Sequence, residues 1–268
     1  MDILFYTFSH RWYVTLFLLT YLFIAIRSHG WRFTFQFLIV GYFIAWISEG
    51  LSIRTGFPYG WYFYIYENLQ GEWLNWGVPV WDSMSYVFLC FAGYSVAEFV
   101  ARRSLLVARN TGTPNDERRA TSLRTHELRL PLLAALFTTI LDIIVDPLSN
   151  MGEQWFLGKI YHYPHPGFYF GIPFFNFAGW FLTAFLIVGI NILLCRGAAC
   201  CARNLPYDGR SKQRPYGVYL YFGIFAFNWL ITLFLRQWFL ALADLAWIAL
   251  PLFWVLHRKK TEKSEKLP

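Results

Sequence analysis

Four carboxyl side chains and one amide, near the ends of otherwise apolar stretches of this 268-residue chain, could together do acid–base chemistry. They are Glu49, Asp82, Asp142, Asp146 and Asn176. A carboxyl group in apolar surroundings can hold or transfer a proton, and an amide can orient a water molecule beside it. These five residues are therefore our candidates for a catalytic site.

The stretches that contain them have the composition of a membrane protein. The chain is 57% hydrophobic, 22% aromatic and only 15% charged, which is rare in a soluble domain. Seven stretches are long enough to cross a hydrocarbon core of about 30 Å. They lie near residues 12–26, 33–53, 78–100, 130–147, 172–195, 216–235 and 238–256. We predict an all-α, polytopic membrane helix bundle, with one transmembrane domain over 1–256 and a basic cytoplasmic tail over 257–268.

Basic residues fix the predicted orientation of these spans. With seven spans, nineteen of the 23 Lys and Arg residues lie on the side of the C-terminus. The four on the other side are Arg11, Arg54, Lys159 and Arg236. The positive-inside rule then predicts an outer N-terminus and an inner C-terminus in the cytoplasmic (inner) membrane. This topology and contact with anionic membrane lipids account for the net charge of +7, so we expect no nucleic-acid partner.

The cysteines predict neither a disulfide framework nor a zinc site. Cys90 lies inside a span, and Cys195, Cys200 and Cys201 lie at the inner end of the fifth span. None is in an outer loop, and the C-x4-CC cluster has no nearby histidine.

The predicted spans place four of the candidates at one depth. Glu49 and Asp142 lie about four or five residues inside the outer ends of their spans, and Asp82 and Asn176 lie about four residues into theirs. At 1.5 Å per residue, all four are roughly one helical turn below the outer surface. Charged groups at such depths usually face the interior of the bundle.

Asp146 adds a fourth carboxyl, one turn above Asp142 on the same helix face, where Pro147 is predicted to break the helix. Apart from Arg54, no Lys or Arg is expected at this level. Burial and like-charge neighbours favour the neutral form, so at least one carboxyl should be protonated at neutral pH. The cluster could be a proton donor, a polar network that joins helices, or a cation site.

A short motif occurs twice, at Gly77-Val-Pro-Val-Trp-Asp and at Gly171-Ile-Pro-Phe-Phe-Asn. Each copy opens a span, and an acidic residue ends the span before it. The pattern predicts two parallel repeats related by an axis along the membrane normal. The common preference for proline at helix starts is an alternative explanation.

The two outer loops, residues 54–66 and 154–170, are dense in aromatic side chains. An interfacial aromatic belt contributes fewer rings at each helix end. We expect the loops to form a lid that dips into the interface and binds an apolar ligand.

Several enzyme and receptor classes are excluded by residue type. No span contains the lysine that a retinal Schiff base needs, and six dispersed histidines are too few for a membrane di-iron centre. There is no P-loop, dinucleotide fingerprint or G-x-S-x-G motif.

The ordered motifs resemble those of the CruF-type carotenoid biosynthesis family, which includes γ-carotene 1′,2′-hydratases and bisanhydrobacterioruberin hydratases. The similarity covers roughly residues 35–255. It rests on Glu49 with Gly56-Phe-Pro-Tyr-Gly60, Gly77-Val-Pro, Leu141-Asp-x-x-x-Asp-Pro147 and Gly171-Ile-Pro-x-x-Asn-x-x-Gly-Trp180. The resemblance implies addition of water to the terminal C1=C2 bond of an acyclic carotenoid, without a cofactor, to give a tertiary alcohol.

That reaction suits the candidate residues. A protonated Asp142 or Asp146 would supply the acid, while Asp82 and Glu49 would activate water or tune the acid, and Asn176 would orient the water. Aromatic faces would stabilise the tertiary cation. The candidates for this role are Tyr59, Trp61, Trp81 and Trp180.

We expect an acyclic carotenoid or related polyisoprenoid to lie between helices with its end under the lid, and no metal ion to take part. The alternative function is a membrane transporter or lipid-binding protein that uses the acidic cluster for proton or cation coupling.

Overall fold

The computed structural model describes residues 2–110, 116–197 and 216–264. Over these residues the chain forms eight α-helices, two short 3₁₀ helices and four two-residue strands. The α-helices are α1 (Ile3–His10), α2 (Trp12–His29), α3 (Trp31–Thr55), α4 (Val80–Asn110), α5 (Asp116–Asn150), α6 (Phe174–Gly197), α7 (Tyr216–Phe234) and α8 (Trp238–Ser264). The remaining elements are β1 (Phe63–Tyr64), η1 (Tyr66–Leu69), β2 (Leu74–Asn75), β3 (Val78–Pro79), η2 (Gly152–Gln154) and β4 (Tyr161–His162).

Seven of the helices described are long and apolar enough to cross a membrane. Their membrane-spanning segments are Trp12–His29, Trp31–Thr55, Val80–Ala101, Leu128–Asn150, Phe174–Cys195, Tyr216–Phe234 and Trp238–His257. Every end lies within about three residues of the boundary predicted from hydropathy. The all-α, seven-span bundle is therefore confirmed, and the protein is an integral membrane protein.

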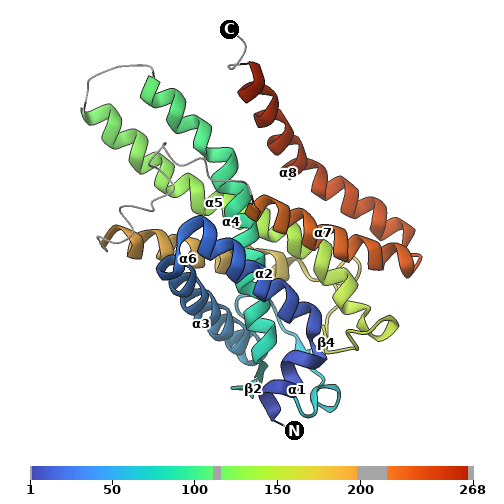
Figure 1. The fold of residues 1–268 in the computed structure, drawn as a ribbon. Helices are drawn as coiled ribbons and strands as arrows, with labels where there is room; N and C mark the ends of the chain where they lie inside the picture. Colours follow the sequence, from blue (N-terminus) through green and yellow to red (C-terminus); the bar gives the residue numbers. More distant parts are fainter. Residues whose placement is uncertain (1, 111–115, 198–215, 265–268) are drawn as a thin grey trace.

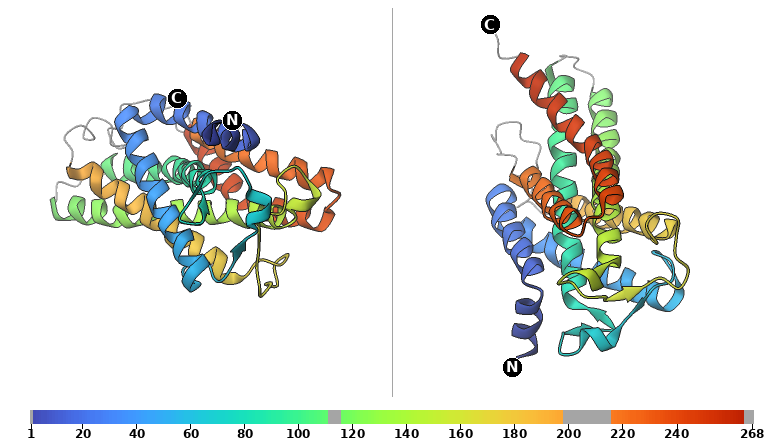
Figure 2. Two further views of the ribbon diagram at one scale, coloured as in Figure 1. Left: turned by 90° about the horizontal axis from the view of Figure 1, so that it is seen from below. Right: turned by 90° about the vertical axis from the view of Figure 1, so that its right-hand side faces the viewer.

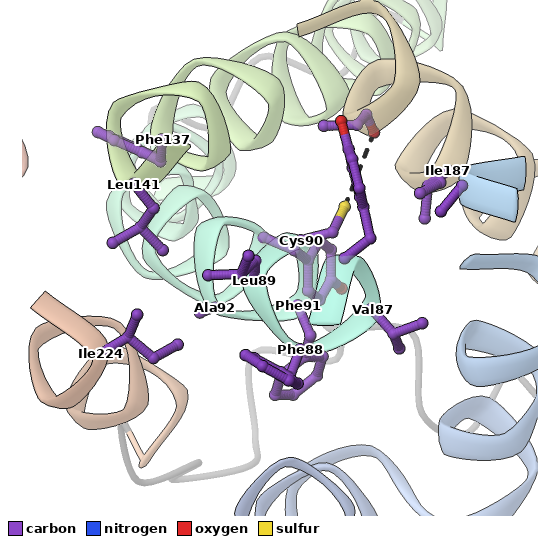
Figure 3. Packing of buried hydrophobic residues seen from close by; sticks show 14 of the residues in the cluster. Val87, Phe88, Leu89, Cys90, Phe91, Ala92, Phe137, Leu141, Ile187 and Ile224 are labelled. Atoms are coloured by element: carbon purple, nitrogen blue, oxygen red, sulfur yellow. Dashed lines mark hydrogen bonds between the residues drawn. The ribbon is translucent and has the colours of Figure 1, made fainter. Parts of the chain in front are cut away.

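Helix α4 is the centre of this bundle. It packs against α2, α3, α5, α7 and α8, and Figure 3 shows its side chains from Val87 to Ala92 facing residues of α5, α6 and α7. Gly93 allows α5 to come close, because a Cβ at this position would lie 2.3 Å from the Thr138 hydroxyl oxygen.

Helices α3, α4, α5 and α6 form a ring. Helix α4 packs against α3 and α5, and α6 packs against α5 and α3. The pairs α3–α4 and α5–α6 thus lie side by side in the ring. The parallel repeat suggested by the duplicated motif stays a prediction.

The loop between α3 and α4 and the loop between α5 and α6 meet at one end of the molecule, near α1 (Figure 1). Strand β1 pairs antiparallel with β4, with Phe63 opposite His162 and Tyr64 opposite Tyr161. We call the two joined loops, residues 56–79 and 151–173, the cap. The described end of α8 lies at the opposite end of the molecule (Figure 2).

Two local expectations were wrong. Helix α5 continues through Pro147 to Asn150, because a proline removes one amide donor and membrane helices tolerate that loss. The segment 101–129, which the predicted spans leave as a connection between 78–100 and 130–147, is mostly helix, since α4 runs to Asn110 and α5 starts at Asp116. The connector 111–115 between them lies outside the described residues.

Two other expectations fall partly outside the described residues. Residues 265–268 of the predicted basic tail and both Cys200 and Cys201 are not described. Within the described part, Cys90 and Cys195 are free and buried.

Candidate acidic site

Asn176 joins the two aspartates of α5 into one polar group. Its amide nitrogen donates to Asp142 Oδ2 at 3.1 Å and to Asp146 Oδ2 at 3.0 Å. The two aspartates share a face because they are one turn apart, and Asn176 reaches them from the first turn of α6. Asp142 is only 1% exposed, so this pair of carboxyls is shielded from solvent.

Asp146 also receives hydrogen bonds from the cap. The hydroxyl of Tyr163 donates to Asp146 Oδ2 at 2.8 Å, and the hydroxyl of Tyr161 donates to Asp146 Oδ1. Asp146 therefore accepts three hydrogen bonds, whereas Asp142 accepts one from Asn176. Hydrogen bonds of this kind stabilise the ionised form of the carboxyl that accepts them.

The other two carboxyls belong to α3 and α4. The hydroxyl of Ser83 donates to Glu49 Oε2 at 2.7 Å, and the hydroxyl of Tyr64 donates to Asp82 Oδ2 at 2.7 Å. Asp82 lies in the first turn of α4, where the positive end of the helix dipole favours a carboxylate. Glu49 is buried and Asp82 is partly exposed.

The Asp142–Asp146–Asn176 group and the Glu49–Asp82 pair form a single acidic site. Glu49 and Asp82 interact electrostatically, and so do Asp82 and Asp146. The charges of both Asp146 and Asp82 raise the pKa of the Tyr161 hydroxyl. The structure thus brings together all five residues that the sequence singled out, under the cap and within the ring of four helices.

Four tyrosines that the sequence analysis did not select complete this site. They are Tyr62, Tyr64, Tyr161 and Tyr163. Burial and the neighbouring carboxylates raise the pKa of each one, so all four hydroxyls stay protonated well above neutral pH. The available signal was the Tyr-x-Tyr pattern in each outer loop, since residues two apart on a strand point to one face.

Two of the four predicted aromatic residues adjoin the acidic site. Trp180 stacks on Tyr86 with ring centroids 3.8 Å apart, and Tyr59 lies 6.3 Å from Tyr86 and 6.5 Å from Trp180. Burial, followed by the charge of Glu49, raises the pKa of Tyr59, whose hydroxyl bonds to that of Thr183 at 3.0 Å. Tyr86 interacts electrostatically with Asp142. These rings therefore border both halves of the site.

The other two predicted aromatic residues lie in different surroundings. Trp61 is 45% exposed and stacks on Phe63, at the outer surface of the cap. Trp81 is buried, but its indole nitrogen donates to Glu72 at 2.5 Å. Trp81 thus contacts Glu72 and Arg11 rather than the carboxyls of the site, and no described contact brings Trp61 to those carboxyls.

The buried cation near the site is Arg11 rather than Arg54. Arg11 is 1% exposed, donates to Glu72 Oε1 and lies 4.6 Å from the Trp81 ring centroid. Its charge also reaches Asp82. Arg54 instead lies over the exposed Trp76, 3.9 Å from the ring centroid. Counting charges along the sequence could not show that α1 and the cap enclose Arg11.

Asp244 on α8 stands apart from the site. It is fully buried, and among the described residues neither of its carboxyl oxygens has a hydrogen-bond partner. It adjoins Tyr169, whose pKa is raised to about 12 by burial and by the charge of Asp244. Asp244 lies about six residues into α8, so a substitution there also changes a buried carboxyl in a span and can serve as a control for substitutions in the acidic site.

A metal centre of the usual kind is not apparent in the part of the chain that the structure describes. No group of three or more His, Cys, Asp or Glu residues there has the geometry to hold a metal ion. Hydroxyl and amide groups donate hydrogen bonds to the carboxyls of the acidic site.

Comparison with known families gives a match over most of the chain. The model of a family described as carotenoid biosynthesis protein matches residues 10–255, which include every residue of the acidic site, six membrane spans and all but the last two residues of the seventh. Comparisons with curated proteins and with solved structures found no match. The chain therefore belongs to the carotenoid biosynthesis protein family, as an integral membrane enzyme that acts on a carotenoid or another isoprenoid.

Proposed function

We propose that this enzyme adds water to the terminal C1=C2 double bond of an acyclic carotenoid. The observation that carries the proposal is the acidic site itself, in which four carboxyls and Asn176 lie within an apolar helix ring under a tyrosine-rich cap. Hydration needs a proton donor, a proton acceptor and protection of a cation. It moves no electrons, so the proposed reaction needs no cofactor.

The Asp142–Asp146 pair supplies the proton. Two carboxyls that interact strongly hold one proton between them more readily than none. Asp146 accepts three hydrogen bonds, which favour its ionised form, so the shared proton resides mainly on Asp142. Asp142 is also the more buried of the two and adjoins Tyr86, where an apolar substrate can approach it.

Protonation of C2 breaks the double bond and leaves a tertiary cation at C1. The rings of Tyr59, Tyr86 and Trp180 contact one another, with Tyr59 near Glu49 and Tyr86 near Asp142, and aromatic faces attract cations. Buried aromatic surroundings also keep other nucleophiles away from the cation.

Water is captured on the side of Glu49 and Asp82. Its oxygen forms the new bond to C1, and one of its protons passes to a carboxylate. Asp82 is assigned as the acceptor because the N-terminus of α4 favours its ionised form and because it is the most exposed of the four carboxyls, where water can reach it. The product is a tertiary alcohol with one added hydrogen at C2.

The proposal includes a place in the cell. We place the protein in the cytoplasmic membrane with the cap on the outer side and the C-terminus inside, following the distribution of Lys and Arg. The polyene then lies along the bundle, with its end at the acidic site.

Expression in a host that makes an acyclic carotenoid tests this function. Pigments from cells with the wild-type protein should gain the mass of one water at each reactive end. Asp142→Asn should leave the pigment unchanged, and Asp244→Asn, which alters another buried carboxyl in a span, should behave as wild type. Unchanged pigments in cells with well-folded wild-type protein would refute hydration and favour the transporter alternative.

A further inference from the structure

Each turnover of the proposed reaction leaves the two halves of the site in the wrong protonation states. The Asp142–Asp146 pair has lost a proton to C2, and Asp82 has gained one from water. The reaction as a whole consumes no proton, so the site is reset when one proton returns from Asp82 to the pair. Asp82 and the pair belong to different helices, α4 and α5.

We propose that Tyr62, Tyr64, Tyr161 and Tyr163 carry this proton across the site. The inference rests on the proposed hydration and assigns to the cap a part in the chemistry beyond covering the substrate. We call these four residues the tyrosine relay.

The tyrosine relay starts at Asp82, which has gained a proton, and ends at Asp146, whose pair with Asp142 has lost one. The Tyr64 hydroxyl bonds to Asp82 at 2.7 Å, and the hydroxyls of Tyr161 and Tyr163 both bond to Asp146. Tyr62 lies 3.5 Å from Tyr64, oxygen to oxygen. Three of the four tyrosines therefore bond directly to a carboxyl, and the fourth extends the chain from the Asp82 side.

The pairing of β1 with β4 brings the two ends together. Tyr64 is opposite Tyr161, so the antiparallel register places Tyr62 beside Tyr163. The ring centroid of Tyr62 lies 6.0 Å from that of Tyr161 and 6.3 Å from that of Tyr163. One bridging water can join hydroxyls across such a ring cluster.

Hydroxyl groups suit this task because each both donates and accepts a hydrogen bond. The proton on Asp82 passes to the Tyr64 oxygen, which releases its own proton to Tyr62, and the same exchange continues to Tyr161 or Tyr163 and to Asp146. Every hydroxyl regains a proton as it gives one up, so no tyrosinate accumulates. The raised pKa of all four tyrosines agrees with hydroxyls that stay neutral.

Burial shields the four hydroxyls of this path from bulk water, while Asp82, where the path starts, is partly exposed. Each of the four tyrosines is less than a tenth exposed. A proton released at Asp82 therefore has a short path through hydroxyls within the site.

Tyr62→Phe tests the relay, because Tyr62 bonds to no carboxyl and its ring remains. With enzyme in excess over substrate, the variant reconstituted in lipid should complete the first turnover at nearly the wild-type rate. With substrate in excess, its steady rate should fall at least tenfold, giving a burst of one product per enzyme. The solvent deuterium isotope effect on the steady rate should rise.

The matched control is Tyr221→Phe, which removes another fully buried hydroxyl, bonded to the Phe137 carbonyl at 2.9 Å. It should show no burst. If Tyr62→Phe does not fold, 3,5-difluorotyrosine at position 62 keeps the hydroxyl and alters its acidity, so the steady rate should change while the first turnover does not. Equal loss of both rates, or no loss of either, would overturn the relay. Absence of product with wild-type protein would instead refute hydration.

Discussion

Replacing each aspartate of the pair by asparagine should have different consequences, although the two residues share one helix face. In Asp142→Asn the new amide oxygen can still accept the hydrogen bond from Asn176, because Asp142 accepts that bond alone. Because that hydrogen bond is kept, the free energy of unfolding should change by less than about 1 kcal/mol. The proton donor is lost, and general acids contribute about 10²–10⁴-fold in rate.

Asp146→Asn should impair both stability and activity. Asp146 accepts hydrogen bonds on both oxygens, from Tyr161 on one and from Tyr163 and Asn176 on the other. An amide replaces one acceptor by a donor, so at least one of these donors is left facing another donor. Leaving a buried donor without its charged acceptor costs about 1.5–3 kcal/mol.

The assay combines turnover with thermal unfolding of the purified variants in the same lipid. Asp244→Asn is the control, since it changes a buried carboxyl that has no hydrogen-bond partner among the described residues. Asp142→Asn should then lose activity at wild-type stability, and Asp146→Asn should lose both. Wild-type turnover by a folded Asp142→Asn protein would remove that residue as the acid and refute the assignment.

Three further outcomes are expected. A reporter fused after Pro268 should give a cytoplasmic signal, and one inserted near Asn68 an external signal; the reverse pattern would invert the proposed topology. Purified protein should keep its hydratase activity in a strong chelator, whereas activity lost and then restored by one metal ion would favour Lewis-acid chemistry. Arg11→Met should destabilise the protein by about 3–5 kcal/mol because it leaves the buried Glu72 without the guanidinium that pairs with it, while Arg54→Met should cost little; equal midpoints of thermal unfolding would contradict this.

The spans and the depth of the site could be predicted from the sequence because both depend on local, regular geometry. Membrane helices must satisfy their own backbone, so apolar length and the rise per residue locate each end. Counting residues from these ends placed Glu49, Asp82, Asp142 and Asn176 at one level, and the structure brings them into one site.

The cap could not be predicted because it depends on contacts between distant segments. The Tyr-x-Tyr pattern is local, but nothing in it shows that Tyr64 of the first outer loop lies opposite Tyr161 of the second. The same limit applies to Trp61, chosen for its place in an aromatic-rich loop and found at the outer surface. Counting charges predicts on which side of the membrane Arg11 lies. It does not show that Arg11 pairs with Glu72.

Incorporation of labelled oxygen tests the central claim most directly. Purified protein in lipid is given an acyclic carotenoid in water enriched in oxygen-18, and the product is analysed by mass spectrometry. The account predicts a tertiary alcohol at C1 that carries one oxygen-18 per hydrated end, and no such product with Asp142→Asn. A product that loses hydrogen, or gains oxygen without the label, would contradict hydration.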